Sequence, residues 1–211
     1  MHKQTCAVRC LGLTVALLVA GAAAHATDFD FSGNFSVDND VALVDFTAGA
    51  PSNVTLFTSS WVQGDPPMGF DPVLSLWRAD GSLIASWDDA NVEGTAFSNG
   101  VPYDYGLWDA YFDVLLTAGD YTVTLTQFDN HPVRPNLSDG FAHDGDPDFT
   151  SGWGPQDHFN GRWPNVEGDP RTSRWEFHIL NLAPAQTVPE PSTWLLLAIG
   201  GLAIARLRRR S

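Results

Sequence analysis

The body of this chain has no cysteine and no lysine. The two cysteines among the 211 residues are Cys6 and Cys10, and the single lysine is Lys3. All three lie within the first ten residues, so once that segment is removed neither a disulfide nor a thiolate is available. Arginine is then the only permanent cation, which restricts the partners that the body can bind through positive charge.

The first 26 residues have the three parts of a secretory signal peptide. Lys3 and Arg9 form a basic start, residues 11–20 are apolar, and Ala24-His25-Ala26 is a small-x-small cleavage site before Thr27. We therefore expect signal peptidase and the general secretion machinery to act on residues 1–26, and we expect the protein to be exported.

Acidic residues dominate the body between the two ends of the chain. Residues 27–187 contain 24 Asp and Glu against five Arg, a formal charge of −19. This balance excludes nucleic acid as a natural partner, because phosphate binding requires clustered cations. Two interpretations remain open, which are binding of divalent cations and a solvated acidic surface that keeps an exported protein soluble.

Apolar residues in the body alternate with polar ones and do not recur at helical spacing. Such alternation, interrupted by turn signals, is typical of antiparallel strands with one buried face. The pattern predicts strands over 28–36, 41–46 and 54–62. We expect residues 27–187 to form one all-β domain, an antiparallel two-sheet sandwich that is jelly-roll-like and has about eight short strands.

Two hairpins and a last strand are the clearest elements of this pattern. Asp80-Gly81 supplies the turn between apolar runs at 73–77 and 82–87. A second hairpin is predicted between 111–116 and 121–128, and a final strand over 174–182. In the second hairpin the residues expected to face the core are Tyr121, Val123 and Leu125, and those expected to face solvent are Thr122, Thr124 and Thr126.

Residues 130–171 show no sustained alternation and predict a long irregular crossover. Asp144, Asp146 and Asp148 place three carboxylates at alternate positions there, and hard cations such as calcium prefer oxygen clusters of this kind. A second candidate calcium site combines Asp71 with Asp88 and Asp89, at the entrance and exit of the first hairpin. The alternative for both sets is ordinary turn chemistry, since Asp is common in loops.

The sequence offers little for catalysis. It lacks a Gly-x-Ser-x-Gly elbow, a His-Glu-x-x-His pair and a phosphate-binding loop. Four histidines of the body, at positions 131, 143, 158 and 178, match no metal-ligand spacing, so we predict a protein that is not an enzyme. Trp153 and Trp163 in the crossover are candidates for stacking on a polysaccharide, and the alternative is that they close one end of the sandwich.

The last 24 residues, 188–211, form three consecutive blocks. Val188, Pro189, Glu190 and Pro191 make a stiff extended box, because proline fixes φ and lacks an N–H donor. Residues 194–205 are apolar and predict a short transmembrane helix of roughly 20 Å. The arginines that follow and would remain on the cytoplasmic side are Arg206, Arg208, Arg209 and Arg210.

These three blocks resemble the PEP-CTERM sorting signal of Gram-negative bacteria. The resemblance implies recognition by an exosortase, which is a membrane cysteine transpeptidase, with cleavage near residues 189–192. It also implies a transient inner-membrane anchor followed by release or transfer to the cell surface or extracellular matrix, and an association with exopolysaccharide.

A second resemblance lies in the body. Asp71 to Trp77, Asp80-Gly81, Asp88-Asp89, Leu116 and Gly119 to Val123 are similar to the bacterial pre-peptidase C-terminal domain. The resemblance covers about residues 29–129 and implies a β-sandwich that acts as an accessory or binding module, in some relatives with calcium in its loops.

The function expected from the sequence is that of a non-enzymatic, exosortase-sorted surface or matrix protein associated with exopolysaccharide. One alternative is a calcium-dependent carbohydrate-binding module. The other is a secreted hydrolase whose site has no recognisable motif.

Overall fold

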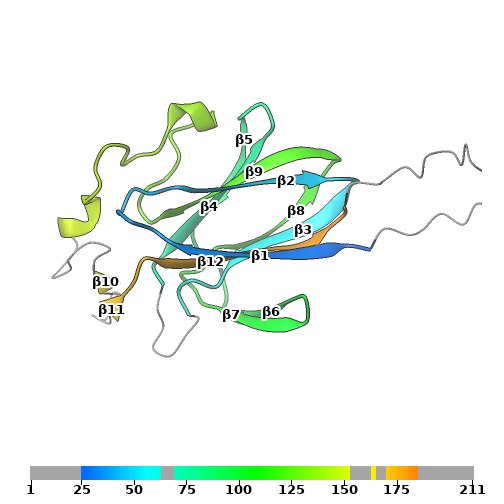
Figure 1. Cartoon of the computed structure of the whole chain (residues 1–211), viewed down its shortest axis with the longest axis horizontal. Coiled ribbons are helices and arrows are strands. Elements are labelled where there is room, and N and C mark those ends of the chain that lie inside the picture. The colour runs from blue at the N-terminus through cyan, green and yellow to red at the C-terminus, as the bar shows by residue number, and fades with distance from the viewer. Residues whose placement is uncertain (1–24, 63–68, 153–162, 165–169, 185–211) are drawn as a thin grey trace, which may run out of the picture.

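The structure is a computed structural model that describes residues 25–62, 69–152, 163–164 and 170–184. Two antiparallel four-stranded sheets lie as two layers over a shared core, so the predicted all-β sandwich is confirmed (Figure 1). In the described residues the helical segments are two short 3₁₀ turns, η1 Leu137–Asp139 and η2 Phe149–Gly152.

We name the two layers sheet A and sheet B. Sheet A has the order β1-β12-β3-β8, and sheet B has the order β2-β9-β4-β5. The strands of sheet A are β1 (Thr27–Asn34), β12 (Arg174–Leu182), β3 (Ser52–Thr58) and β8 (Tyr111–Leu116). The strands of sheet B are β2 (Ala42–Ala48), β9 (Gly119–Gln127), β4 (Pro72–Arg78) and β5 (Leu83–Trp87).

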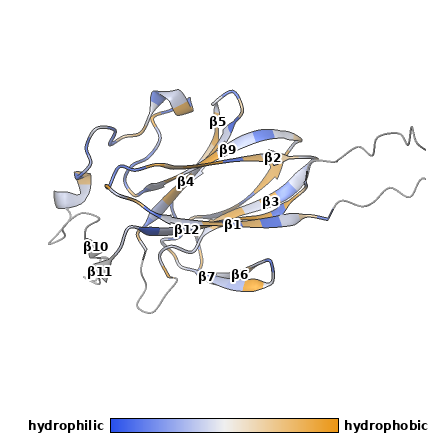
Figure 2. Cartoon of the chain, in the orientation of Figure 1, coloured by the Kyte–Doolittle hydropathy of each residue, from blue (hydrophilic) through white to orange (hydrophobic). Residues whose placement is uncertain are grey.

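Alternation along the strands produces the core. Hydrophobic segments recur on the strands of both sheets (Figure 2). The apolar side chains of the core cluster between the sheets are almost fully buried. The central members are Val54, Leu56, Phe70, Leu74, Leu76, Phe112, Val123, Leu125, Phe177 and Ile179. Burial of this many large apolar side chains, at about 25 cal/mol per Å², is the main force that holds the two sheets together.

The β4–β5 hairpin forms as predicted. Gly81 has a φ of 82°, and its N–H donates to the carbonyl of Arg78 over 2.8 Å. The Asp80 carboxylate accepts from both the backbone N–H and the hydroxyl of Ser82, which fixes the same turn. The final strand is also confirmed, since β12 spans Arg174–Leu182 as expected.

The predicted hairpin between 111–116 and 121–128 is wrong. Strand β8 pairs with β3 at the edge of sheet A, whereas β9 lies between β2 and β4 in sheet B. The connection at residues 117–118 therefore carries the chain from one sheet to the other. Leu116 and Tyr121 both point into the core, and a crossing between layers buries them as well as a hairpin would.

The threonine face of β9 is not the wet surface that alternation predicted. Thr124 and Thr126 are each 1% exposed, while Thr122 is half-buried. The Trp77 indole N–H donates to Thr124 Oγ1 over 2.9 Å, and Thr126 Oγ1 donates to the carbonyl of Asn130 over 2.8 Å. Long-range packing thus covers a face that local patterning marks as exposed.

Two hairpins were not predicted. One pairs β6 (Gly94–Ser98) with β7 (Val101–Tyr105) and lies outside sheet A, below β1 and β12 in Figure 1. The other pairs two residues each of β10 (Trp163–Pro164) and β11 (Pro170–Arg171). Apart from this pair and the 3₁₀ turns η1 and η2, the described part of the crossover is irregular, in agreement with the sequence.

The sandwich has two unlike ends. We call the end at which the chain enters β1 and leaves β12 the near end, and the opposite end the far end. At the near end, β1 begins at Thr27, which pairs with Leu182 at the end of β12, so both termini of the domain lie together (Figure 1). The turns at this end are residues 49–51, 117–118 and 79–82, the last because Arg78 at the end of β4 pairs with Tyr121 near the start of β9. At the far end lie loop 35–41, loop 106–110 and residues 142–152 of the crossover, the last held by Asp38 N–H donating to the carbonyl of Pro147.

Candidate functional site

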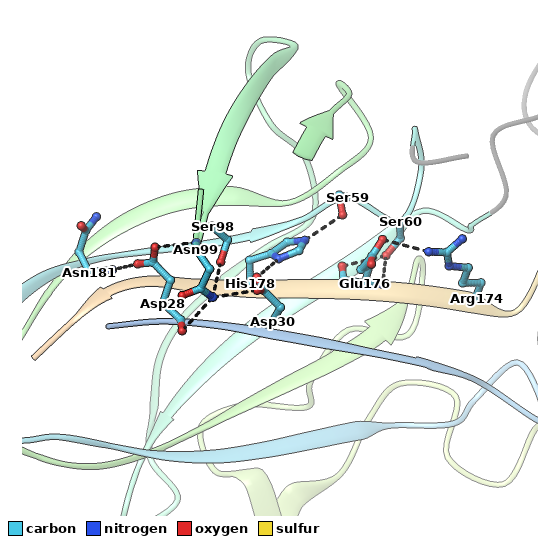
Figure 3. A network of polar contacts seen from close by, with 10 residues as sticks. All are labelled: Asp28, Asp30, Ser59, Ser60, Ser98, Asn99, Arg174, Glu176, His178 and Asn181. Carbon is cyan, nitrogen blue, oxygen red and sulfur yellow. Dashed lines mark hydrogen bonds and ion pairs between the residues drawn. The ribbon is translucent and has the colours of Figure 1, made fainter. Parts of the chain in front are cut away.

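A chain of polar contacts on the outer face of sheet A is the part of the described structure that most resembles a catalytic arrangement. His178 lies in β12 with its ring fully buried, stacked on Phe57 at 4.4 Å and packed against Tyr103 at 4.1 Å. Its Nε2 lies 2.9 Å from Ser59 Oγ, and its Nδ1 lies 2.7 Å from Asp30 Oδ1 (Figure 3).

The partners determine which ring nitrogen carries the hydrogen. An ionised carboxylate can only accept, so in the neutral ring Nδ1–H donates to Asp30, and Nε2 accepts from the Ser59 hydroxyl. Burial lowers the pKa of His178 below its usual value, although the hydrogen bond and charge of Asp30 act in the opposite direction. Partial burial acts to raise the pKa of Asp30, but hydrogen bonds from Ser98, His178 and Asn99 outweigh it and lower that pKa.

The β6–β7 hairpin closes over this chain of contacts. Asn99, at the tip of the hairpin, donates its side-chain N–H to Asp30 over 3.0 Å and its backbone N–H to Asp28 over 3.1 Å. Asp28 also accepts the backbone N–H of Asn181 in β12 over 2.9 Å. The carboxylates of β1 therefore fasten both the hairpin and the exit of β12 (Figure 3).

Serine, histidine and aspartate are connected here as in a hydrolytic triad, but their surroundings differ from those of a catalytic site. Ser59 is fully buried, and its backbone N–H donates to the carbonyl of Glu176 over 3.2 Å. The next two backbone N–H groups, of Ser60 and Trp61, donate to Asp109. A tetrahedral intermediate needs free donors beside the nucleophile, and at residues 59–61 each of these donors already has an acceptor.

Asp109 is the second buried polar centre and lies at the far end of sheet A. It is fully buried and accepts hydrogen bonds from Thr58 Oγ1 over 2.9 Å and from the N–H groups of Trp61 and Gly106 over 3.0 Å each. Burial raises the pKa of Asp109 to about 7, although the donated hydrogen bonds act to lower it. This carboxyl joins the segment after β3 to the loop before β8.

The three aspartates of the first predicted calcium site lie in successive turns of the crossover. Asp144 Oδ2 accepts the backbone N–H of Phe141 over 2.9 Å, and the N–H of Asp146 donates to the carbonyl of His143 over 3.0 Å. The carbonyl of Asp148 accepts the N–H of Ser151 over 3.1 Å. These contacts are those of ordinary turns.

The second predicted set lies around the strand ends of sheet B. Asp71 precedes β4 and its carbonyl accepts the N–H of Phe128, while Asp88 lies 3.9 Å from His131 Nε2. Burial, and then the neighbouring charge of Asp88, raises the pKa of Asp89. Across the part of the chain that the structure describes, no three His, Cys, Asp or Glu side chains are grouped so that they could hold a metal ion, and calcium binding stays a prediction.

Most other predicted site residues lie outside the described residues. These are Trp153, the box Val188 to Pro191, the arginines from Arg206 to Arg210 and most of the predicted signal peptide. Trp163 falls in β10, and only its backbone position is described. No helix within the described ranges is both long and apolar enough to cross a bilayer.

An open groove of about 450 Å³ lies beside β2 and β9. Its polar lining consists of two aspartate–threonine pairs, in which Thr122 Oγ1 donates to Asp45 over 2.6 Å and Thr47 Oγ1 donates to Asp120 over 2.7 Å. Each carboxylate keeps further lone pairs for donors that approach from solvent. Such groups suit the hydroxyls of a carbohydrate.

Sequence reasoning missed the buried role of His178 because strict alternation places it on the solvent face of β12. One sequence signal could have predicted the β6–β7 hairpin that covers His178. Asn99-Gly100 is a strong two-residue turn signal, with φ values of 50° and 80°, and it predicts the hairpin that packs on that face. Nothing in the local sequence links that hairpin to β12, because residues 99 and 178 are far apart along the chain.

Comparison with known protein families identifies the C-terminal segment. A family model described as the PEP-CTERM protein-sorting motif matches residues 187–210. No curated protein matches the chain. The motif implies that an exosortase sorts this protein to the cell surface, and that the exported chain is anchored transiently in the membrane before sorting. The resemblance of the body to the pre-peptidase C-terminal domain stays a prediction.

Proposed function

We propose that this is a non-enzymatic protein of the cell surface or extracellular matrix of a Gram-negative bacterium, and that it works with exopolysaccharide. The observation that carries the proposal is the sorting motif at residues 187–210, which is separated from the end of β12 by four residues, 183–186. A folded sandwich joined to such a motif is exported, and it would act through its surface outside the cell.

Two features of the body support the proposal. The groove with Asp45 and Asp120 offers carboxylate and hydroxyl oxygens, which are the groups that commonly recognise sugar hydroxyls. The buried chain from Ser59 through His178 to Asp30 fastens a hairpin, and this structural role accounts for the arrangement without catalysis.

The polysaccharide part is tested by co-sedimentation of the folded protein with exopolysaccharide from the producing bacterium. We expect the wild type to bind, and Asp45→Asn combined with Asp120→Asn to bind about tenfold more weakly, a loss of about 1.4 kcal/mol. The matched control is Asp113→Asn, which alters a similar threonine–aspartate pair outside the groove and should bind as the wild type does. If the wild type stays in the supernatant, the association with exopolysaccharide is wrong.

The non-enzymatic part is tested with a fluorophosphonate, which reacts with activated serine hydroxyls. Because Ser59 is buried and its neighbouring N–H groups are engaged, we expect no label on the native protein. Labelling that disappears in Ser59→Ala and in His178→Gln, while both variants remain folded, would instead establish the hydrolase alternative.

A further inference from the structure

Shortly before the sorting motif in the sequence, the chain is held by hydrogen bonds at the end of β12. The N–H of Gly49 donates to the carbonyl of Ala183 over 2.8 Å, and the N–H of Ala183 donates to Ser52 Oγ over 3.4 Å. The turn between β2 and β3 and the first residue of β3 therefore fix Ala183, which lies one residue beyond β12. From that point the chain is no longer part of the sheet.

Only four residues, 184–187, separate Ala183 from the box that begins at Val188. At roughly 3.4 Å per residue, a fully extended chain spans at most about 17 Å between the Cα atoms of these two residues. The strands of sheet A are six to nine residues long, which places the far end roughly 20 to 30 Å further away at about 3.3 Å per residue. An enzyme that holds the box thus has the near end within reach, and the far end beyond it.

The near end has a surface that suits such an approach. Two of its turns, Gly49-Ala50-Pro51 and Thr117-Ala118, contain no charged residue, although the body as a whole carries a formal charge of −19, and a third turn, residues 79–82, contains Asp80. Pro51, Thr117 and Ala118 are exposed. These two neutral turns are short and belong to strands β3 and β8 of sheet A and to the strands of sheet B that they join, whereas the exposed carboxylates of Asp80 and Asp120 lie beside them on sheet B.

We propose that the near end of the sandwich, at turns 49–51 and 117–118, is a docking surface for the exosortase that grips the Val188–Pro191 box. The folded body then contributes to recognition, and the four-residue tether sets the distance between the two contacts. This inference rests on the sorting motif and not on exopolysaccharide binding, so either one can fail without the other.

The first test lengthens the tether in the full-length precursor. An insert of about eight Gly and Ser residues between Gln186 and Thr187 leaves both the box and the near end unchanged. Lengthening the tether from four residues to about 12 should slow processing about fivefold, because effective concentration falls roughly as the −3/2 power of linker length. Pulse-chase conversion of precursor to mature protein measures the rate. An unchanged or faster rate would overturn the proposal.

The second test changes the surface itself. Pro51→Glu combined with Ala118→Glu places two charges on the near end, and Val92→Glu is the control, at an exposed position in the loop after β5. We expect slower processing for the near-end variant alone, at an unchanged melting temperature. Pro189→Ala with Glu190→Ala serves as the variant that blocks processing altogether.

Photo-cross-linking identifies the occupant. A photoreactive residue at position 118 of the precursor should capture exosortase, while the same residue at position 92 should not. Capture of lipid alone at position 118 would mean that the near end faces the membrane and would overturn the assignment to the enzyme. Equal capture of exosortase at both positions would overturn it as well.

Discussion

At the near end of the sandwich, strands are joined by turns of two to four residues, whereas at the far end β1 and β2 are joined by seven residues, 35–41. The near turns are short, and the carboxylate that fixes one of them, Asp80, is exposed and accepts from Ser82 within the same turn. The far loops have no sheet partners and depend on carboxylates that accept several N–H groups, as Asp109 does for the segments around Trp61 and Gly106. Long loops at the far end can thus keep a fixed conformation as long as buried carboxylates such as Asp109 accept their N–H groups.

The dependence of the far end on buried carboxylates gives the largest expected effect. Asp109→Asn replaces an acceptor by an N–H₂ group facing other donors, and leaving one or two buried N–H groups unpaired should cost about 3 kcal/mol of unfolding free energy. Urea denaturation measures this cost. Asp113→Asn is the matched control, because it removes an exposed carboxylate that pairs with Thr55 and should cost less than about 0.5 kcal/mol. Equal losses would contradict the distinction.

The pH dependence of stability should separate Asp109 from His178. The pKa of Asp109 is raised above its unfolded value, so its contribution is complete below about pH 4 and is lost as pH rises through about 7. The pKa of His178 is lowered, so its contribution is present above about pH 6.5 and is lost as pH falls below that value.

Unfolding free energies at several pH values between 4 and 8 test both signs, with the two variants compared to the wild type. We expect the wild type to lose stability relative to Asp109→Asn as pH rises, and relative to His178→Gln as pH falls. A wild-type profile parallel to that of both variants would show that neither group titrates as described.

Two glycine substitutions compare a turn within a sheet with the crossover. Gly81 and Gly145 have φ values of 82° and 83°, so alanine at either position should cost about 1 kcal/mol locally. An added Cβ meets no atom closer than 3.9 Å at Gly81 and nothing within 4 Å at Gly145, which leaves the backbone as the cause.

We expect Gly81→Ala to lower the global unfolding free energy, since the turn joins two strands of sheet B. Gly145→Ala should instead increase hydrogen exchange around residues 142–150 with little effect on global unfolding. Equal global losses would mean that the crossover unfolds together with the sheets.

The smallest expected effect concerns divalent cations. Because Asp144 accepts a backbone N–H within its own turn, and no three His, Cys, Asp or Glu side chains of the described residues are grouped to hold a metal ion, calcium and magnesium should raise the melting temperature equally, within about 1 °C. Thermal unfolding with each ion at equal concentration measures this. A larger shift with calcium, lost in Asp146→Asn with Asp148→Asn, would instead establish the calcium site predicted from the sequence.

Alternation was sufficient to predict the sandwich, the β4–β5 hairpin and the limits of β12, because a strand with one buried face carries its own pattern. It failed between β8 and β9. A two-residue connection such as 117–118 can turn back within one sheet or cross to the other, and local sequence does not distinguish these paths. The path depends on whether β8 pairs with β3 or with β9, and in the structure β8 pairs with β3 at the edge of sheet A.

The candidate sites divide in the same way. The sorting box and its flanking blocks act as a linear signal, so residues 188–211 were recognisable without any fold, and the family match at 187–210 bears this out. His178 and Asp109 could not be recognised in this manner, because each acquires its role from partners distant in sequence, such as Asp30 and Thr58.

The sequence by itself determined the class of fold, the acidity of the body and the sorting signal, since each depends on composition or on short contiguous patterns. Tertiary structure alone decided which polar residues are buried, which hairpin covers sheet A and at which end of the sandwich the last strand, β12, finishes. The physical reason is that burial and long-range hydrogen bonding are properties of pairs of segments, and a pair exists only after the chain has folded.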